Sequence, residues 1–235
     1  MSRRFFYIII LCLSLMIALG GLAYGSSWDD QLDVLLPKRN LTEQESTTIK
    51  GIFNNADARQ IPTDLLMPRL EEGLAKQVSP EGLVQVLNRE LAAYETTRAL
   101  ILQVLGQKTG DQILQAVLPW TRTVLLALQG TPESELTELL VAFNQQKSKD
   151  RWDNYRFGCS LYAALVQWGI DQTDSLALVV AVSKSTLPGA DYRGLLDLII
   201  AGGKLRVSPD VMAERIIRAV PKVRSIDALE TRVLY

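Results

Sequence analysis

Carboxylates are the only side chains in this sequence whose type suits acid–base chemistry. The chain contains no histidine, which excludes a Ser-His-Asp or Cys-His arrangement, a His-ligated metal and an imidazole proton shuttle. The acids cluster at Asp29–Asp30, at Glu71–Glu72 and at Glu90 with Glu95. Two carboxylates facing each other across a cleft can hydrolyse a glycosidic bond. Neighbouring acids on a helix are more often a solvated face, so we rank a glycan hydrolase behind the other hypotheses.

Cysteine chemistry is equally restricted. Cys12 lies in an apolar N-terminal run, and Cys159 is the only other cysteine. If the N-terminal run is removed, no intrachain disulfide can form, and Cys159 is expected to be a buried, inert thiol. No residue spacing predicts a catalytic motif, a cofactor or a metal site. We therefore do not expect an enzyme.

Aromatic side chains form one candidate contact surface. On a helix, Trp152, Tyr155, Cys159, Tyr162 and Val166 would lie on one stripe, because they are three or four residues apart. Such a stripe can bind a glycan, a lipid or a partner helix. It is more often the buried face of an amphipathic helix, which is the interpretation we favour.

Basic side chains form a second candidate surface near the C-terminus. Arg215, Arg218 and Lys222 share one helical face by their spacing. This face could contact anionic lipid head groups or wall polymers. A solvated face is the more common role of such a group.

The N-terminus has the composition of an export signal. Arg3 and Arg4 precede an apolar run over residues 5–19, and Ala23 and Gly25 suit the positions before a cleavage site. This pattern predicts a secretory signal peptide, residues 1–25, with cleavage after Gly25. The alternative is an uncleaved anchor over residues 5–24, which would be long enough to span the cytoplasmic membrane. Both interpretations place residues 26–235 outside that membrane, in the periplasm or the extracellular space.

The overall charge excludes one class of partner. The chain has 25 basic and 26 acidic residues, and a nucleic-acid-binding protein would have a basic surplus. Membrane contact is expected only through the N-terminal segment, if that segment is retained. Residues 26–235 can form one large domain or two small ones, with a candidate subdivision at the polar residues 146–150.

Capping signals and hydrophobic periodicity predict helices throughout the mature chain. Three helix starts share a hydroxyl residue, a proline and an acid, beginning at Ser79, Thr131 and Ser208. The first opens a long periodic helix that should end at Gly106 and Gly110. Residues 111–128 should form two short helices broken near Pro119. Residues 176–182 would suit a strand, but we interpret them as a buried helix because their neighbours are helical.

Two segments of the mature chain are similar enough to predict an internal duplication. Residues 69–91 align without gaps to residues 198–220, with five identities in 23 positions that include Gly73 with Gly202. The sequence thus predicts an all-α, compact multi-helix bundle with two similar helix–turn–helix hairpins. Independent convergence on the same turn chemistry is the alternative. Two copies without a short regular period argue against a long solenoid.

These observations lead to three functional hypotheses. The first is an exported helical protein without catalytic activity that acts by contact, as an envelope adaptor, scaffold or assembly accessory bound to another envelope protein. The second is a periplasmic module that binds a lipid or small molecule, based on the aromatic stripe. The third is a carboxylate-dependent hydrolase of cell-wall glycan.

Overall fold

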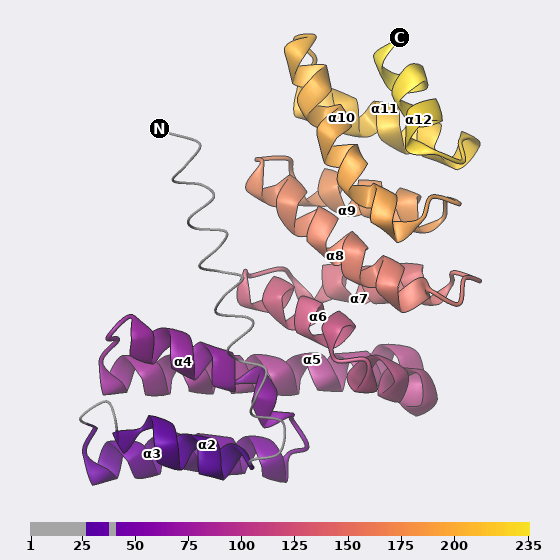
Figure 1. Ribbon diagram of the computed structural model, residues 1–235. Helices are drawn as coiled ribbons and strands as arrows, with labels where there is room; N and C mark the ends of the chain where they lie inside the picture. Colours follow the sequence, from indigo (N-terminus) through magenta and orange to yellow (C-terminus); the bar gives the residue numbers. More distant parts are fainter. Residues whose placement is uncertain (1–26, 38–40) are drawn as a thin grey trace. The chain divides into compact units, whose positions relative to one another are not determined.

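The computed structural model describes residues 27–37 and 41–235. In these residues the fold is all-α, with eleven α-helices and no strand (Figure 1). Contacts divide the chain into two compact units, Met1–Asn88 and Arg89–Tyr235, called unit 1 and unit 2 below. The predicted signal segment lies outside the described residues. No helix in the described ranges is both long and apolar enough to cross a membrane.

Unit 1 is built from helices, two of which, α2 (Trp28–Leu35) and α3 (Glu43–Ala58), begin with a capping box. Its other elements are the 3₁₀ turn η3 (Thr63–Leu65), α4 (Met67–Ala75) and the first turns of α5 (Pro80–Gln115). The Thr42 hydroxyl accepts the Glu45 N–H while the Glu45 carboxylate accepts the Thr42 N–H, which forms the predicted capping box of α3. Trp28 of α2 stacks on the buried Phe53 of α3 and joins the two helices.

Unit 2 begins within α5 and contains seven further α-helices. In chain order, these helices and two 3₁₀ turns are α6 (Leu118–Leu128), α7 (Glu133–Asn144), α8 (Arg151–Gln167), α9 (Gln172–Ser183), η4 (Gly189–Asp191), α10 (Tyr192–Lys204), α11 (Pro209–Ala219), η5 (Val220–Lys222) and α12 (Ile226–Leu234).

The helices of unit 2 form a two-layer stack of hairpins, which we call the hairpin stack. Helix α8 packs between α6 and α10, and α9 packs between α7 and α11. Each helix also packs against its hairpin partner, as α7 does against α6 and α11 does against α10. One layer is therefore α6, α8, α10 and α12, and the other is α7, α9 and α11 (Figure 1). This neighbour-to-neighbour pattern is that of a helical repeat.

One turn geometry recurs in the hairpin stack. Gly130, Gly169 and Arg206 all have a positive φ, and they are 39 and 37 residues apart. In each turn, the next N–H donates to a carbonyl five residues back, as from Val207 to Gly202 at 3.0 Å. This is the Schellman end of a helix, which satisfies carbonyls that would otherwise lack a partner. The turn is therefore the common element of successive hairpins.

The two hairpins aligned in the sequence share this geometry. Gln77 of unit 1 has the same positive φ as Arg206, and the Val78 N–H donates to the Gly73 carbonyl at 3.0 Å. Both glycines let the second helix approach closely. A Cβ on Gly73 would collide with Leu83, and one on Gly202 would collide with Met212. The alignment missed the intervening hairpins because neither carries a glycine at the equivalent position of its first helix.

Several predicted helix boundaries are confirmed. Gly106, with φ 72° and ψ 164°, interrupts α5 where the periodic helix was expected to end. This backbone conformation is essentially restricted to glycine. Residues 111–128 are divided between two helices, but the break lies at residues 116–117 and not at Pro119, which lies in the first turn of α6. Residues 176–182 lie in α9 and are helical, as predicted. Residues 146–150 form the loop between α7 and α8 inside unit 2.

Candidate functional site

The acidic clusters predicted as catalytic candidates hold structural positions. In unit 1, Lys76 and Arg69 each lie 2.6 Å from the Glu72 carboxylate and lower its pKa. The Asp30 side chain closes the capping box at the start of α2, and Asp29 lies 3.6 Å from Lys50 of α3. In these positions the acids stabilise helix ends and helix pairs.

The remaining acidic candidates belong to unit 2. Glu90 is buried on α5, one residue beyond the boundary between the units, and Glu95 is half-buried on the same helix. In unit 1 a pocket of about 470 Å³ is lined by Glu45 and Glu81. Glu45 is held by its capping role, at 2.7 Å from the Thr42 N–H. No group of three or more Cys, Asp or Glu side chains within the described ranges could hold a metal ion.

The aromatic stripe is the buried face of α8. Tyr155 is 0% exposed and Tyr162 is 1% exposed, whereas Trp152 is half-buried. The Tyr155 hydroxyl pairs with Thr123 of α6 at 2.8 Å, and the Tyr162 hydroxyl donates to Glu135 of α7. Two of the three proposed contact residues therefore belong to the core of unit 2 and not to its surface.

Burial also controls the chemistry of the stripe. It raises the pKa of the Cys159 thiol to about 12 and raises that of Tyr155 well above its ordinary value. The pKa of Tyr162 is raised by burial and by its hydrogen bond to Glu135. A thiol needs its ionised form to act as a nucleophile. These groups stay neutral at physiological pH.

The predicted basic face is exposed, but its members make local contacts. Arg215 of α11 donates to the Val233 carbonyl of α12 at 3.2 Å, which satisfies a carbonyl at the end of that helix. Arg218 pairs with Glu214 one turn away at 3.0 Å. Lys222 lies at the end of η5 and is exposed. The three side chains thus lie in one region of unit 2, where Arg215 links α11 to the last helix, α12.

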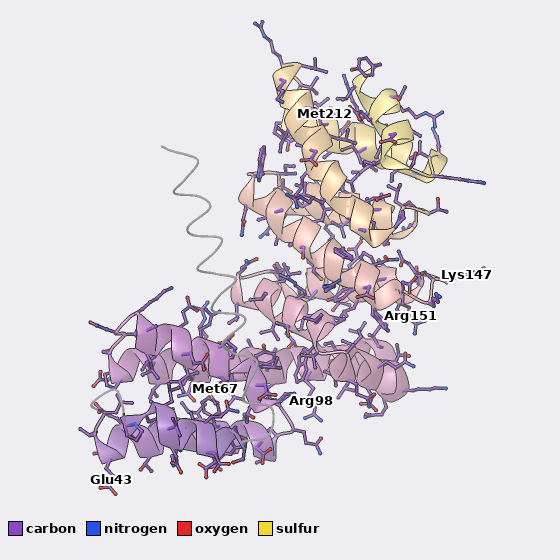
Figure 2. All side chains as sticks on the ribbon, viewed as in Figure 1. Glu43, Met67, Arg98, Lys147, Arg151 and Met212 are labelled. Atoms are coloured by element: carbon purple, nitrogen blue, oxygen red, sulfur yellow. The ribbon has the colours of Figure 1, made fainter. Side chains whose placement is uncertain are left out.

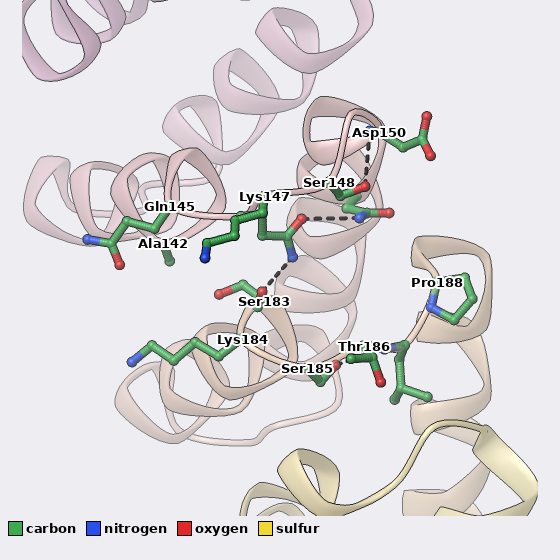
Figure 3. Close-up of a pocket in the computed structure, with 13 residues that line it drawn as sticks. Ala142, Gln145, Lys147, Ser148, Asp150, Ser183, Lys184, Ser185, Thr186 and Pro188 are labelled. Carbon is green, nitrogen blue, oxygen red and sulfur yellow. Dashed lines mark hydrogen bonds between the residues drawn. The ribbon is translucent and has the colours of Figure 1, made fainter.

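A groove in unit 2 was not predicted from the sequence. It has a volume of about 650 Å³ and lies where the α7–α8 loop meets the segment that joins α9 to η4 (Figure 3). We call it the loop groove. Its lining comprises residues 142, 145–148, 150, 154 and 183–188. It lies at the end of the hairpin stack opposite the Schellman turns, since each loop follows the second helix of a hairpin.

Amide side chains fix the floor of the loop groove. The Gln146 side chain donates to the Ser183 carbonyl at 2.5 Å and accepts from Asn154 Nδ2 at 3.1 Å (Figure 3). The Asn154 Oδ1 in turn accepts the Gly189 N–H at 3.0 Å. Beside Gln146 lies the buried Tyr192, whose pKa burial raises to about 12. This network joins the α7–α8 loop, α8, α9 and η4 into one rigid surface.

The rim of the loop groove is basic. Gln145, Lys147 and Lys184 are exposed, and their side chains extend to the same side, the left in Figure 3. Neither lysine pairs with a carboxylate in the part of the chain that the structure describes. Asp150, the acid in the lining, points away from both lysines (Figure 3). Lys147 and Arg151 mark this end of the helices at the right edge of Figure 2.

The sequence contained only part of the signal for this site. Residues 146–150 stand out as a polar break, a pattern that the sequence alone does not distinguish from a linker between domains. Their partner segment, residues 183–188, lies more than one helix away, and a single sequence does not show that two such loops meet. Compared with protein-family models, curated proteins and solved structures, the chain matches none of them.

Proposed function

We propose that this chain is an exported helical-repeat protein that acts by contact, as an adaptor, scaffold or assembly accessory in the cell envelope. The observation that carries the proposal is the hairpin stack, in which successive hairpins pack side by side and leave their turns and loops exposed. Proteins of this architecture use such extended surfaces to bind other macromolecules. The export signal predicted at residues 1–25 supports the compartment.

Two exposed apolar residues support a binding role for the turn side of the stack. Trp168 and Leu205 hold the same position in successive hairpins, directly before Gly169 and Arg206. Trp168 is 53% exposed and Leu205 is 56% exposed. Exposed tryptophan is enriched where proteins bind each other, because its large ring contributes much contact area.

The competing hypotheses have less support. Lipid binding was based on the aromatic stripe, and Tyr155 and Tyr162 fill the core of unit 2. Glycan hydrolysis needs two acids placed across a cleft, whereas Glu72, Asp30 and Glu45 stabilise helix ends and ion pairs. The contact hypothesis requires neither a ligand cavity in the core nor a catalytic pair.

Site-specific cross-linking in the native host tests the proposal. A photo-reactive amino acid replaces Trp168 in one variant and Leu205 in another, and mass spectrometry identifies the cross-linked products. We expect both positions to capture the same protein, since the two residues lie on successive turns. Lys108, exposed on α5, is the control position and should capture little of it.

Two results would contradict the proposal. One is the absence of a shared product at Trp168 and Leu205, or equal capture at Lys108. The other is turnover of cell-wall glycan by the purified chain that a single Glu→Gln substitution abolishes, because the protein would then be an enzyme.

A further inference from the structure

We propose that the loop groove binds an acidic peptide segment of the partner protein. This inference rests on the proposed contact function and adds the chemistry by which the partner is recognised. It concerns the loop side of the hairpin stack, whereas Trp168 and Leu205 lie on the turn side. The two sides can therefore be tested separately.

Charge is the first argument for an acidic ligand. Lys147 and Lys184 come from two different loops and line the same groove, and neither has a carboxylate partner among the described residues. The α7–α8 loop also contains Lys149 and is followed by Arg151. The acid of this loop, Asp150, points away from Lys147 and Lys184 (Figure 3). Two unpaired ammonium groups beside a concave surface attract carboxylates.

Unused hydrogen-bond donors are the second argument. The side chains of Gln145 and Thr186 line the groove and make no hydrogen bond within the described residues. The Ser148 hydroxyl accepts the Asp150 N–H at 3.1 Å and keeps its own proton to donate. The rim thus offers two charges and several neutral donors to one ligand.

The dimensions and rigidity of the groove favour a peptide over a small anion. Its volume of about 650 Å³ falls within the range of sites that enclose drug-sized ligands, and one phosphate would fill only a small part of it. A peptide supplies carboxylates for Lys147 and Lys184 and backbone amides for Gln145. The hydrogen bonds of Gln146 and Asn154 hold the floor in place before binding, so little ordering cost remains.

Fluorescence anisotropy with a defined probe tests the inference. The full chain, purified in the form that its host accumulates, is titrated into a fluorescein-labelled peptide of alternating Glu and Ser residues. We expect saturable binding that weakens as sodium chloride is added, because salt screens exposed charges. The double variant Lys147→Gln, Lys184→Gln should bind about tenfold more weakly, since each exposed pair contributes a modest free energy.

A matched variant separates the groove from the net charge. Lys108→Gln with Lys204→Gln removes the same charge from exposed residues of unit 2 that do not line the groove. It should change the affinity by less than about twofold. A peptide of alternating Gln and Ser residues should not bind. All variants should keep the native melting temperature because the replaced lysines are exposed.

Three results would overturn the inference. They are equal binding by the Lys147, Lys184 double variant, an equal loss in the matched variant, and equal binding of the Gln–Ser peptide. Inorganic phosphate that protects both groove lysines from acetylation as well as the peptide does would also overturn it, since the groove would then be a simple anion site. Cross-linking at Trp168 and Leu205 that persists when peptide binding fails would reject the groove and leave the contact function standing.

Discussion

At the residue scale, Cys159 illustrates how burial removes chemistry from a side chain. Its thiol lies in the core of unit 2, beside the buried Tyr155, and burial raises its pKa from an ordinary 9.0 to about 12. Tyr192, buried beneath the loop groove, has a pKa raised from 10.0 to about 12 for the same reason. Both groups are neutral in the folded chain over a pH range in which the unfolded chain would ionise them.

The sign of the resulting pH dependence follows from these shifts. Because both pKa values are higher in the folded chain, the stabilising effect is complete below the unfolded values and is lost as the pH rises towards about 12. We expect the free energy of unfolding, measured with urea, to fall with rising pH from about 9 upwards. In the Cys159→Ala variant, the free energy of unfolding should start to fall at a higher pH, because the thiol with the lower unfolded pKa is absent. A free energy that stays constant or increases over this range would contradict the prediction.

At the element scale, the turn between α10 and α11 depends on a close helix contact. Gly202 faces the buried Met212, so a methyl group there would overlap the Met212 side chain. Gly203, the next residue on the same helix, has no atom within 4 Å of where its Cβ would lie. The two neighbouring glycines therefore differ in packing while they share a helix.

This difference predicts opposite effects of the same substitution. Gly202→Ala should lower the free energy of unfolding by about 1–3 kcal/mol, because it overpacks a buried contact. Gly203→Ala should raise it by about 0.5–1 kcal/mol, because alanine is the better helix former and no contact opposes it. Urea titrations of both variants measure the difference. Equal effects would mean that Met212 moves aside freely, and the close approach would not stabilise the hairpin.

Local chemistry explains which elements the sequence could predict. Ser208 followed by Pro209 defines a helix start through contacts within a few residues, and Gly106 interrupts α5 through its own backbone conformation. The repeat was harder to find, because the turns at Gly130 and Gly169 keep the geometry while the flanking side chains differ. The loop groove could not be located from the polar residues 146–150 alone, since it depends on contacts between separate loops.

At the scale of the whole molecule, the contacts divide the chain into two compact units. The candidate boundary was the polar segment 146–150, which lies between two helices of the hairpin stack. The contacts place the boundary between Asn88 and Arg89, within α5. A polar segment indicates exposure to solvent, and a loop inside a helical repeat is as exposed as a linker between domains.

The N-terminal prediction also belongs to this scale. If residues 1–25 are a cleaved signal peptide, the intact mass of the chain purified from its host should correspond to residues 26–235. Replacing the small residue three positions before the cleavage site, as in Ala23→Leu, should block cleavage and leave the full-length mass. A native chain that retains Arg3 and Arg4 would instead support the uncleaved anchor.

The neighbour-to-neighbour packing of the hairpin stack has a consequence for folding. Each helix of unit 2 makes most of its contacts with helices close to it in sequence, so the contact order is low. Folding can then nucleate in any hairpin and propagate in both directions, as in a one-dimensional Ising chain. Helix α12 packs mainly on α10 and α11, whereas α8 packs on helices of both neighbouring hairpins, so the amide protons of α12 should exchange faster than those of α8.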